Sequence, residues 1–173
     1  LIFSHHKEKE TAMHFTSKLP DVGTTIFTVM SKLAHQEGAI NLAQGFPGFD
    51  SDPKLQQLVT KAMSDGYNQY APMPGVYGLR EQIANKINTL YGSDYHPESE
   101  VTVTAGATQA IYTIVSAFIR PGDEVIVLKP AYDCYEPAIT VNGGTIVPIQ
   151  LKAPLYKVNW SAVERAITPK TKM

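Results

Sequence analysis

Apolar residues recur three or four positions apart in two segments of the first half of the chain. In the first segment they are Leu55, Leu58, Val59, Ala62 and Met63, and in the second Leu79, Ile83, Ala84, Ile87, Leu90 and Tyr91. This spacing places them on one face of a helix. Asp52 and Pro53 are typical of a helix start, and Gly66 and Gly92 of helix ends. The pattern therefore predicts helices over about residues 53–65 and 79–91.

From residue 101 onward the pattern alternates between strands and helices. Strands are predicted over 101–105, 124–128 and 145–151, the first two buried, and Pro148 indicates a bulge or an edge in the third. Helices are predicted from about Thr108 to Phe118, between the second and third strands up to Asn142, and over 159–167. This order is the signature of an α/β fold, a mostly parallel sheet with flanking helices and right-handed crossovers.

Composition narrows the class of protein. The chain has 173 residues, which fits about one domain, and 43% of them are hydrophobic, enough for a core. Its net charge of −1 provides no basic face for nucleic acid. A single cysteine excludes an internal disulfide, and no apolar run approaches the ~18 residues of a membrane span. We therefore expect a cytoplasmic globular protein with neither nucleic acid nor membrane as a partner.

The two ends of the chain carry separate expectations. Residues 1–17 are expected to be a leader or a disordered tail, with Met13 a candidate start, and His5 and His6 to be solvated rather than metal ligands. No metal site is predicted. Residues 168–173, a turn followed by basic residues, are typical of a segment that leads into a strand. Because no strand follows, we expect the chain to be a fragment of a longer protein.

The first candidate site is the turn Ala105-Gly106-Ala107-Thr108, between the first predicted strand and its helix. Ligands of open α/β sheets bind beyond the carboxyl ends of strands, and a helix N-terminus suits a phosphate. The alternative is a tight turn capped by Thr108 that binds nothing. The turn lacks both the Gly-Lys-Ser/Thr of a P-loop and the spacing of a dinucleotide fingerprint.

A second candidate is the segment 129–137, which directly follows the buried strand. Tyr132 is expected to project toward the same end of the sheet, where its ring can stack on a planar ligand; alternatively, it packs at the start of the next helix. Cys134 is expected to be a structural thiol rather than a nucleophile, because no histidine in this segment could activate it.

The two turns belong to a set of four segments that resembles the N-terminal part of class I aminotransferases, fold-type I enzymes that use pyridoxal 5′-phosphate (PLP). The segments are 40–47 (INLAQGFP), 67–80 (YNQYAPMPGVYGLR), 101–110 (VTVTAGATQA) and 122–137 (GDEVIVLKPAYDCYEP). Their order and spacing follow the family over about residues 18–173. Within the family, the string DCYEP resembles the sequences of one branch, the kynurenine/glutamine transaminases and bacterial methionine aminotransferases.

The resemblance implies a cofactor site. Gly106, Ala107 and Thr108 would hold the PLP phosphate, and Tyr132 would stack on its pyridine ring. In a homodimer, Tyr70 would reach the phosphate bound by the neighbouring subunit. The alternative for Tyr70 is a loop aromatic that packs on two nearby prolines, Pro72 and Pro74.

The resemblance also implies two substrate contacts. The backbone N–H of Gly45 would bind the substrate carboxylate, at a place without room for a side chain. Phe27 would line the substrate pocket; the alternative is that it belongs to the apolar face of a helix with Ile26, Met30 and Leu33.

In this family the decisive residues lie further along the chain: the Schiff-base lysine, an Asp for the pyridine nitrogen, an Asn and an Arg. No catalytic residue is therefore predicted here, and Lys129 and Lys152 lack the context of a Schiff-base lysine. The expected activity is transamination between an aromatic, methionine or glutamine-like amino acid and a 2-oxo acid, in a longer parent, with the chain alone inactive. A PLP-dependent C–S β-lyase and a non-catalytic phosphate-binding or dimerisation module remain alternatives.

The resemblance divides the chain into parts. After the tail over 1–17, residues 18–48 would belong to the small domain and the rim of the active site. Residues 49–173 would form the first, incomplete part of the large PLP-binding domain.

Overall fold

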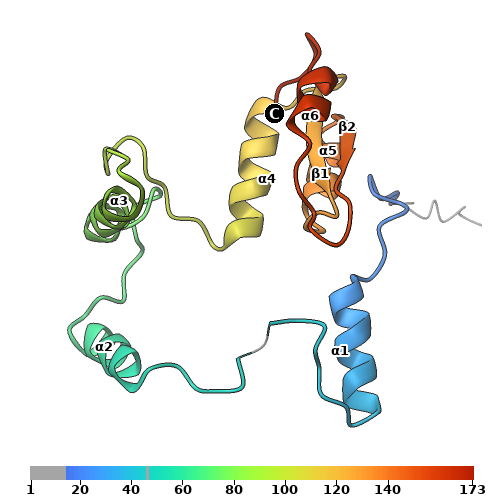
Figure 1. The fold of residues 1–173 in the computed structure, drawn as a ribbon. Coiled ribbons are helices and arrows are strands. Elements are labelled where there is room, and N and C mark those ends of the chain that lie inside the picture. Colours follow the sequence, from blue (N-terminus) through green and yellow to red (C-terminus); the bar gives the residue numbers. More distant parts are fainter. Residues whose placement is uncertain (1–14, 46) are drawn as a thin grey trace, which may run out of the picture.

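The computed structural model describes residues 15–45 and 47–173, which form helices and a small parallel sheet. In chain order the elements are α1 (Ile26–Gln36), α2 (Pro53–Ser64), α3 (Tyr77–Tyr91), α4 (Ala107–Phe118), β1 (Glu124–Lys129), α5 (Tyr135–Val141), β2 (Thr145–Gln150) and α6 (Trp160–Ala166). The strands pack with α4, α5 and α6 in one α/β unit, whereas α1, α2 and α3 lie apart from it on extended connections (Figure 1).

The sheet is parallel, as predicted. β1 and β2 run in register from Glu124 opposite Thr145 to Lys129 opposite Gln150, with α5 connecting them. Pro148 lies in β2, which pairs only with β1 among the described residues and is therefore an edge strand. On the other side of β1, the C-terminal residues 170–173 lie parallel to it. The N–H of Glu124 donates to the Lys170 carbonyl at 2.9 Å, and that of Ile126 to the Met173 carbonyl at 2.8 Å.

The core lies between β1 and two helices. Its buried members are Val115, Ile119, Val125, Val127, Ala138 and Ile139. Burying one such aliphatic side chain stabilises a fold by about 1.5–3 kcal/mol. Gly144 lets β2 approach this core, because a Cβ there would lie 2.7 Å from Cγ2 of Ile119 and 2.9 Å from Cγ2 of Ile139. The core therefore holds the carboxyl end of β1 in a fixed position relative to α4.

The predicted strand over 101–105 is wrong for the described chain. These residues are neither strand nor helix, and Val101 and Val103 are half-buried. The N–H of Val103 donates to the carbonyl of Pro74 at 2.9 Å. A strand needs a continuous ladder with a neighbour. None of the described elements lies along this segment to provide one, so it remains an extended connection from α3 to α4.

The predicted helices form where their capping residues indicate. Asp52 caps α2 by accepting a hydrogen bond from the N–H of Lys54 at 2.7 Å, and Gly92 ends α3 with φ of 67°. The apolar face of α2 is largely exposed, however: Leu58 retains 54% of its accessible surface and Met63 also 54%. The local sequence pattern was therefore enough to predict α2, although no described element packs against its apolar face.

Candidate functional site

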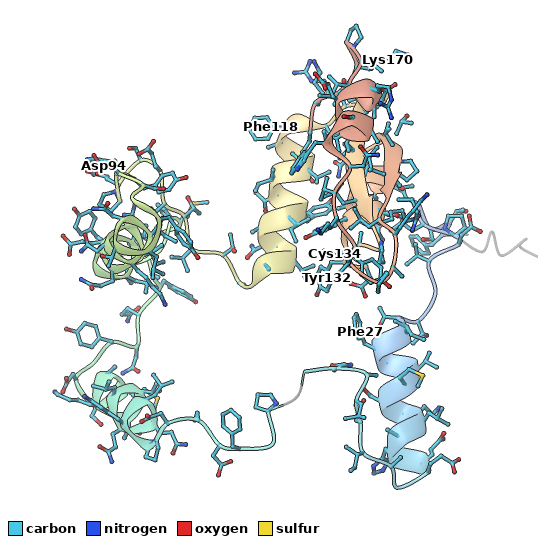
Figure 2. The ribbon with its side chains drawn as sticks, viewed as in Figure 1. Phe27, Asp94, Phe118, Tyr132, Cys134 and Lys170 are labelled. Atoms are coloured by element: carbon cyan, nitrogen blue, oxygen red, sulfur yellow. The ribbon has the colours of Figure 1, made fainter. Side chains whose placement is uncertain are left out.

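The two predicted turns lie at one end of the α/β unit. In Figure 2, Tyr132 and Cys134 are at the end opposite Phe118, the last residue of α4, and so at the end where α4 begins. The Thr108 side chain, in the first turn of α4, is near enough to the Cys134 thiol to act on its pKa, which it lowers. The carboxyl end of β1 and the N-terminus of α4 therefore lie close to each other.

The start of α4 leaves backbone donors available. Its N-cap is Gly106, with φ of 91° and ψ of 166°, which is a conformation that favours glycine. Glycine has no side chain to cap the helix, and among the described residues no acceptor is bonded to the N–H groups of Ala107, Thr108 and Gln109. Unpaired N–H groups and the positive end of the helix dipole together favour the binding of an anion.

The turn before α4 is held by its own hydrogen bonds. The N–H of Gly106 donates to the Thr104 carbonyl at 2.8 Å, and the N–H of Ala105 to Oε1 of Gln109 at 2.5 Å. A Cβ at Gly106 would meet none of the described atoms within 4 Å, so the space in front of the helix is open. This donor set and this space fit the phosphate group of PLP.

Thr108 does not cap the turn, so the capping role that the alternative gave to this residue is wrong. Helix α4 begins at Ala107, one residue before the predicted start, and Thr108 lies inside its first turn. Among the described backbone N–H groups none donates to its hydroxyl, and the side chain instead lowers the pKa of the nearby Cys134 thiol. A hydroxyl in this position remains close to the unpaired N–H groups of the helix.

Tyr132 combines features of both of its predicted roles. Its ring packs edge to face against Tyr135, the first residue of α5, with a centroid distance of 6.0 Å and an interplanar angle of 77°. It nevertheless keeps 47% of its surface exposed. The contact with Tyr135 restricts the ring, and the exposed surface leaves room for a planar ligand to stack on it.

Burial raises the pKa of the Cys134 thiol, and the charge of Asp133 raises it further. Hydrogen bonds from its own backbone and from the Thr108 side chain act in the opposite direction but do not cancel the rise. A thiol with a raised pKa is protonated at neutral pH and is a weak nucleophile. The pKa direction therefore agrees with the predicted structural role of Cys134.

A cavity of about 620 Å³, which the sequence analysis missed, lies beside Tyr132. The N-terminal segment 18–22 forms one wall, and residues 129–133 together with one face of α5 and Ile146 of β2 form the other. Lys129 lines this cavity, with its Nζ 2.6 Å from Oε1 of Glu136. Residues 18–22 carry no motif that could have predicted this contact between segments far apart in the sequence.

The remaining predicted site residues have no described contact with the phosphate turn. Asn41 and Gln44 both donate to the Ser31 hydroxyl of α1, at 3.0 and 3.1 Å, and so fix the loop before Gly45. A Cβ at Gly45 would meet none of the described atoms within 4 Å. The sequence predicted that a side chain at residue 45 would have no room, but the described residues of this chain leave that space open.

Phe27 is half-buried in the first turn of α1, whereas its neighbour Ile26 is 63% exposed. Figure 2 shows Phe27 at the end of α1 closer, in this view, to Tyr132 and Cys134. Tyr70 is 100% exposed, so the alternative prediction, that it packs on Pro72 and Pro74, is wrong. Phe27 and Tyr70 thus both remain available to ligands or to another subunit.

Comparison with known proteins decides the family. The family model for aminotransferase class I and II matches residues 37–173, most of the chain. The chain belongs to the class I and II aminotransferases. These are PLP-dependent enzymes, and both the predicted resemblance and the fold-type I class are confirmed.

Two of the similar relatives carry names of the predicted branch. The chain is 48% identical over 157 residues to the methionine aminotransferase of Escherichia coli K12, covering 91% of this chain and 41% of the relative. It is 31% identical over 162 residues to human kynurenine–oxoglutarate transaminase 3, covering 91% of this chain and 36% of that relative.

A solved structure of YbdL from Escherichia coli, reported with a methionine aminotransferase function, superimposes with a TM-score of 0.87 at 48% identity. The superposition covers 92% of this chain and 42% of that structure. The chain thus spans about two fifths of the length of these relatives. None of the described helices is long and apolar enough to cross a membrane.

Proposed function

We propose that the protein containing this chain is a PLP-dependent aminotransferase. It transfers an amino group between an aromatic, methionine or glutamine-like amino acid and a 2-oxo acid. The observation that carries the proposal is the family match over residues 37–173, which includes the anion site at the start of α4. Residues 18–48 would contribute the rim of the active site and residues 49–173 the first part of the large domain.

In this proposal the N-terminus of α4 anchors the cofactor. The N–H groups of Ala107 and Thr108 and the Thr108 hydroxyl donate to the phosphate, with Gly106 leaving space for it. Bonds from several donors to a dianion are charge-assisted and therefore strong. They fix one end of PLP and so determine where its ring lies. When bound, PLP supplies the electron sink for chemistry at the substrate Cα.

Tyr132 orients the ring of the cofactor. Its own ring is held by the edge contact with Tyr135, so little freedom is lost when a planar group stacks on it. Gly45 donates its N–H to the substrate carboxylate, and Phe27 lines the pocket for an apolar or aromatic side chain. Tyr70 donates its hydroxyl to the phosphate held by the partner subunit of a homodimer.

The test is a substrate screen of the full-length protein loaded with PLP. Methionine, phenylalanine, kynurenine and glutamine are each supplied with a 2-oxo acid acceptor, and the new 2-oxo acid is quantified. The proposal expects the donor to yield its 2-oxo acid in equal amount to the amino acid formed from the acceptor.

The same preparation is incubated with a cysteine S-conjugate without an acceptor. Pyruvate, ammonia and a free thiol as the main products, with no transfer from any donor, would identify a C–S β-lyase and overturn the proposal. A protein that binds PLP and turns over none of these compounds would also overturn it.

A further inference from the structure

Arg80 in α3 is the buried charged side chain of the described structure. It retains 6% of its accessible surface, and among the described residues no carboxylate forms an ion pair with it. A buried charge is costly unless hydrogen bonds compensate for its lost hydration. The bonds that compensate Arg80 therefore show which parts of the chain it holds together.

The guanidinium group connects two separate segments. Its Nε donates to the carbonyl of Gly75 at 3.1 Å, and its Nη1 to the carbonyls of Pro97 and Glu98 at 2.8 and 3.1 Å. The group also lies over the Tyr77 ring, with 5.7 Å from Cζ to the ring centroid. A planar fork can bond in several directions at once, which the single ammonium group of a lysine does less well.

The same two segments meet again at Gly75 and Val103. The N–H of Val103 donates to the carbonyl of Pro74 at 2.9 Å. Gly75 is buried with φ of 99°, and a Cβ there would lie 2.8 Å from Cβ of Val103. Glycine is thus needed at this contact for both its conformation and its size. The loop that ends at Gly75 is closed against the segment that continues to Gly106.

Tyr70 stands at the other end of this closed loop. Its side chain is 100% exposed and that of Met73 is 97% exposed, so neither contributes to holding the loop in place. The N–H of Gly75 bonds to the carbonyl of Pro72 at 2.8 Å, which stiffens the return of the chain. The Gly75 end of the loop is therefore fixed, while the Tyr70 side chain projects from it.

We propose that Arg80 is a positioning residue for the cofactor site. It fastens the loop that carries Tyr70 to the segment 97–103, which leads into the phosphate turn before α4. The position of Tyr70 is thereby set relative to the body of its own subunit. This inference rests on the proposed function, in which Tyr70 donates to the PLP phosphate of the partner subunit.

The first measurement uses the full-length protein without PLP and does not depend on activity. Arg80→Met is compared with Lys86→Met, which removes an exposed cation from the same helix. Hydrogen exchange of the Gly75 and Val103 amides should become at least tenfold faster in Arg80→Met and stay unchanged in Lys86→Met. Unchanged exchange at both amides in Arg80→Met would overturn the proposal.

The second measurement is the PLP dissociation constant, obtained by titrating the apo protein. Arg80→Met should raise it about tenfold, the effect of losing one well-placed hydrogen bond to a charged group. Lys86→Met should change it less than twofold. In a Tyr70→Phe background Arg80→Met should add less than a further twofold, because the hydroxyl that Arg80 positions is already absent.

The two proposals fail in different ways. Equal effects of Arg80→Met with and without the Tyr70 hydroxyl would show that Arg80 stabilises the fold in general, and would overturn its positioning role. If Tyr70→Phe leaves the PLP dissociation constant unchanged, the proposed contact of Tyr70 is wrong, whatever amide exchange shows for Arg80. Should Arg80→Met fail to fold, Arg80→Lys carries the same comparisons, with the same directions and smaller changes.

Discussion

At the scale of single residues, the Thr108 hydroxyl is close both to the Cys134 thiol and to the unpaired N–H groups at the start of α4. It lowers the pKa of the Cys134 thiol, and it belongs to the turn of α4 whose N–H groups are unpaired among the described residues. In the full-length protein, Thr108→Ala should weaken PLP binding by about 1.5–3 kcal/mol at most, because the backbone donors remain. A titration of the apo protein with PLP measures this loss, with Thr113→Ala, farther along α4, as the control. Unchanged affinity would mean that the hydroxyl serves only Cys134.

The acidity of Cys134 gives a second prediction. Burial is the largest cause that raises the thiol pKa and the negative charge of Asp133 the second, so Asp133→Asn should lower this pKa. Alkylation requires the thiolate. The pH profile of iodoacetamide modification should therefore move to lower pH in Asp133→Asn. It should move to higher pH in Thr108→Ala, which loses a bond that lowers the pKa. Shifts in the reverse directions would contradict the assignment of these two causes.

At the scale of elements, the approach of β2 to α4 and α5 depends on Gly144. Because its Cβ would come within 3 Å of both Ile119 and Ile139, Gly144→Ala must displace two core side chains. Such overpacking costs about 1–3 kcal/mol. Thermal or denaturant unfolding of the full-length protein should show this loss of stability. Gly48→Ala is the matched control, since no described atom lies within 4 Å of its Cβ position. Equal stability of the two variants would contradict this account of the core.

At the scale of the whole molecule, the exposed loop at Tyr70 leads to a prediction about assembly. If each active site takes Tyr70 from one subunit and the Schiff-base lysine from the other, mixed dimers of a Tyr70 variant and a lysine variant differ from both parents. One site then carries both defects and the other carries neither. Mixing Tyr70→Ala with a variant of that lysine should restore up to about a quarter of wild-type activity, the statistical share of intact sites. Mixed dimers that remain as inactive as the parents would show that Tyr70 does not act across an interface.

Much of this protein can be predicted from its sequence because the signals concerned are local. The Asp52 cap and Gly92 define α2 and α3 through bonds within a few residues of the chain. The unbroken run at 125–128 predicted a strand, because a strand covered on both faces has no polar positions. The strand forms, with Val125 and Val127 buried and Ile126 and Leu128 half-buried among the described residues. The turn at Gly106 was predicted by the same logic, since its conformation and its unpaired N–H groups follow from a glycine before a helix. Family membership followed from four such segments in order.

The tertiary structure alone decided how distant segments meet. Residues 101–105 have the composition of a strand. A strand also needs a neighbouring strand to hydrogen-bond with, and the composition of a segment does not show whether such a neighbour is present. Parts far apart in the chain also meet where Thr108 lies near Cys134, where residues 18–22 form a cavity wall, and where Arg80 bonds to Pro97 and Glu98. The sequence determined caps, turns and periodicity, because these depend on neighbours along the chain. Packing partners are chosen by shape, burial and unpaired hydrogen-bonding groups in three dimensions, and only the folded chain specifies these.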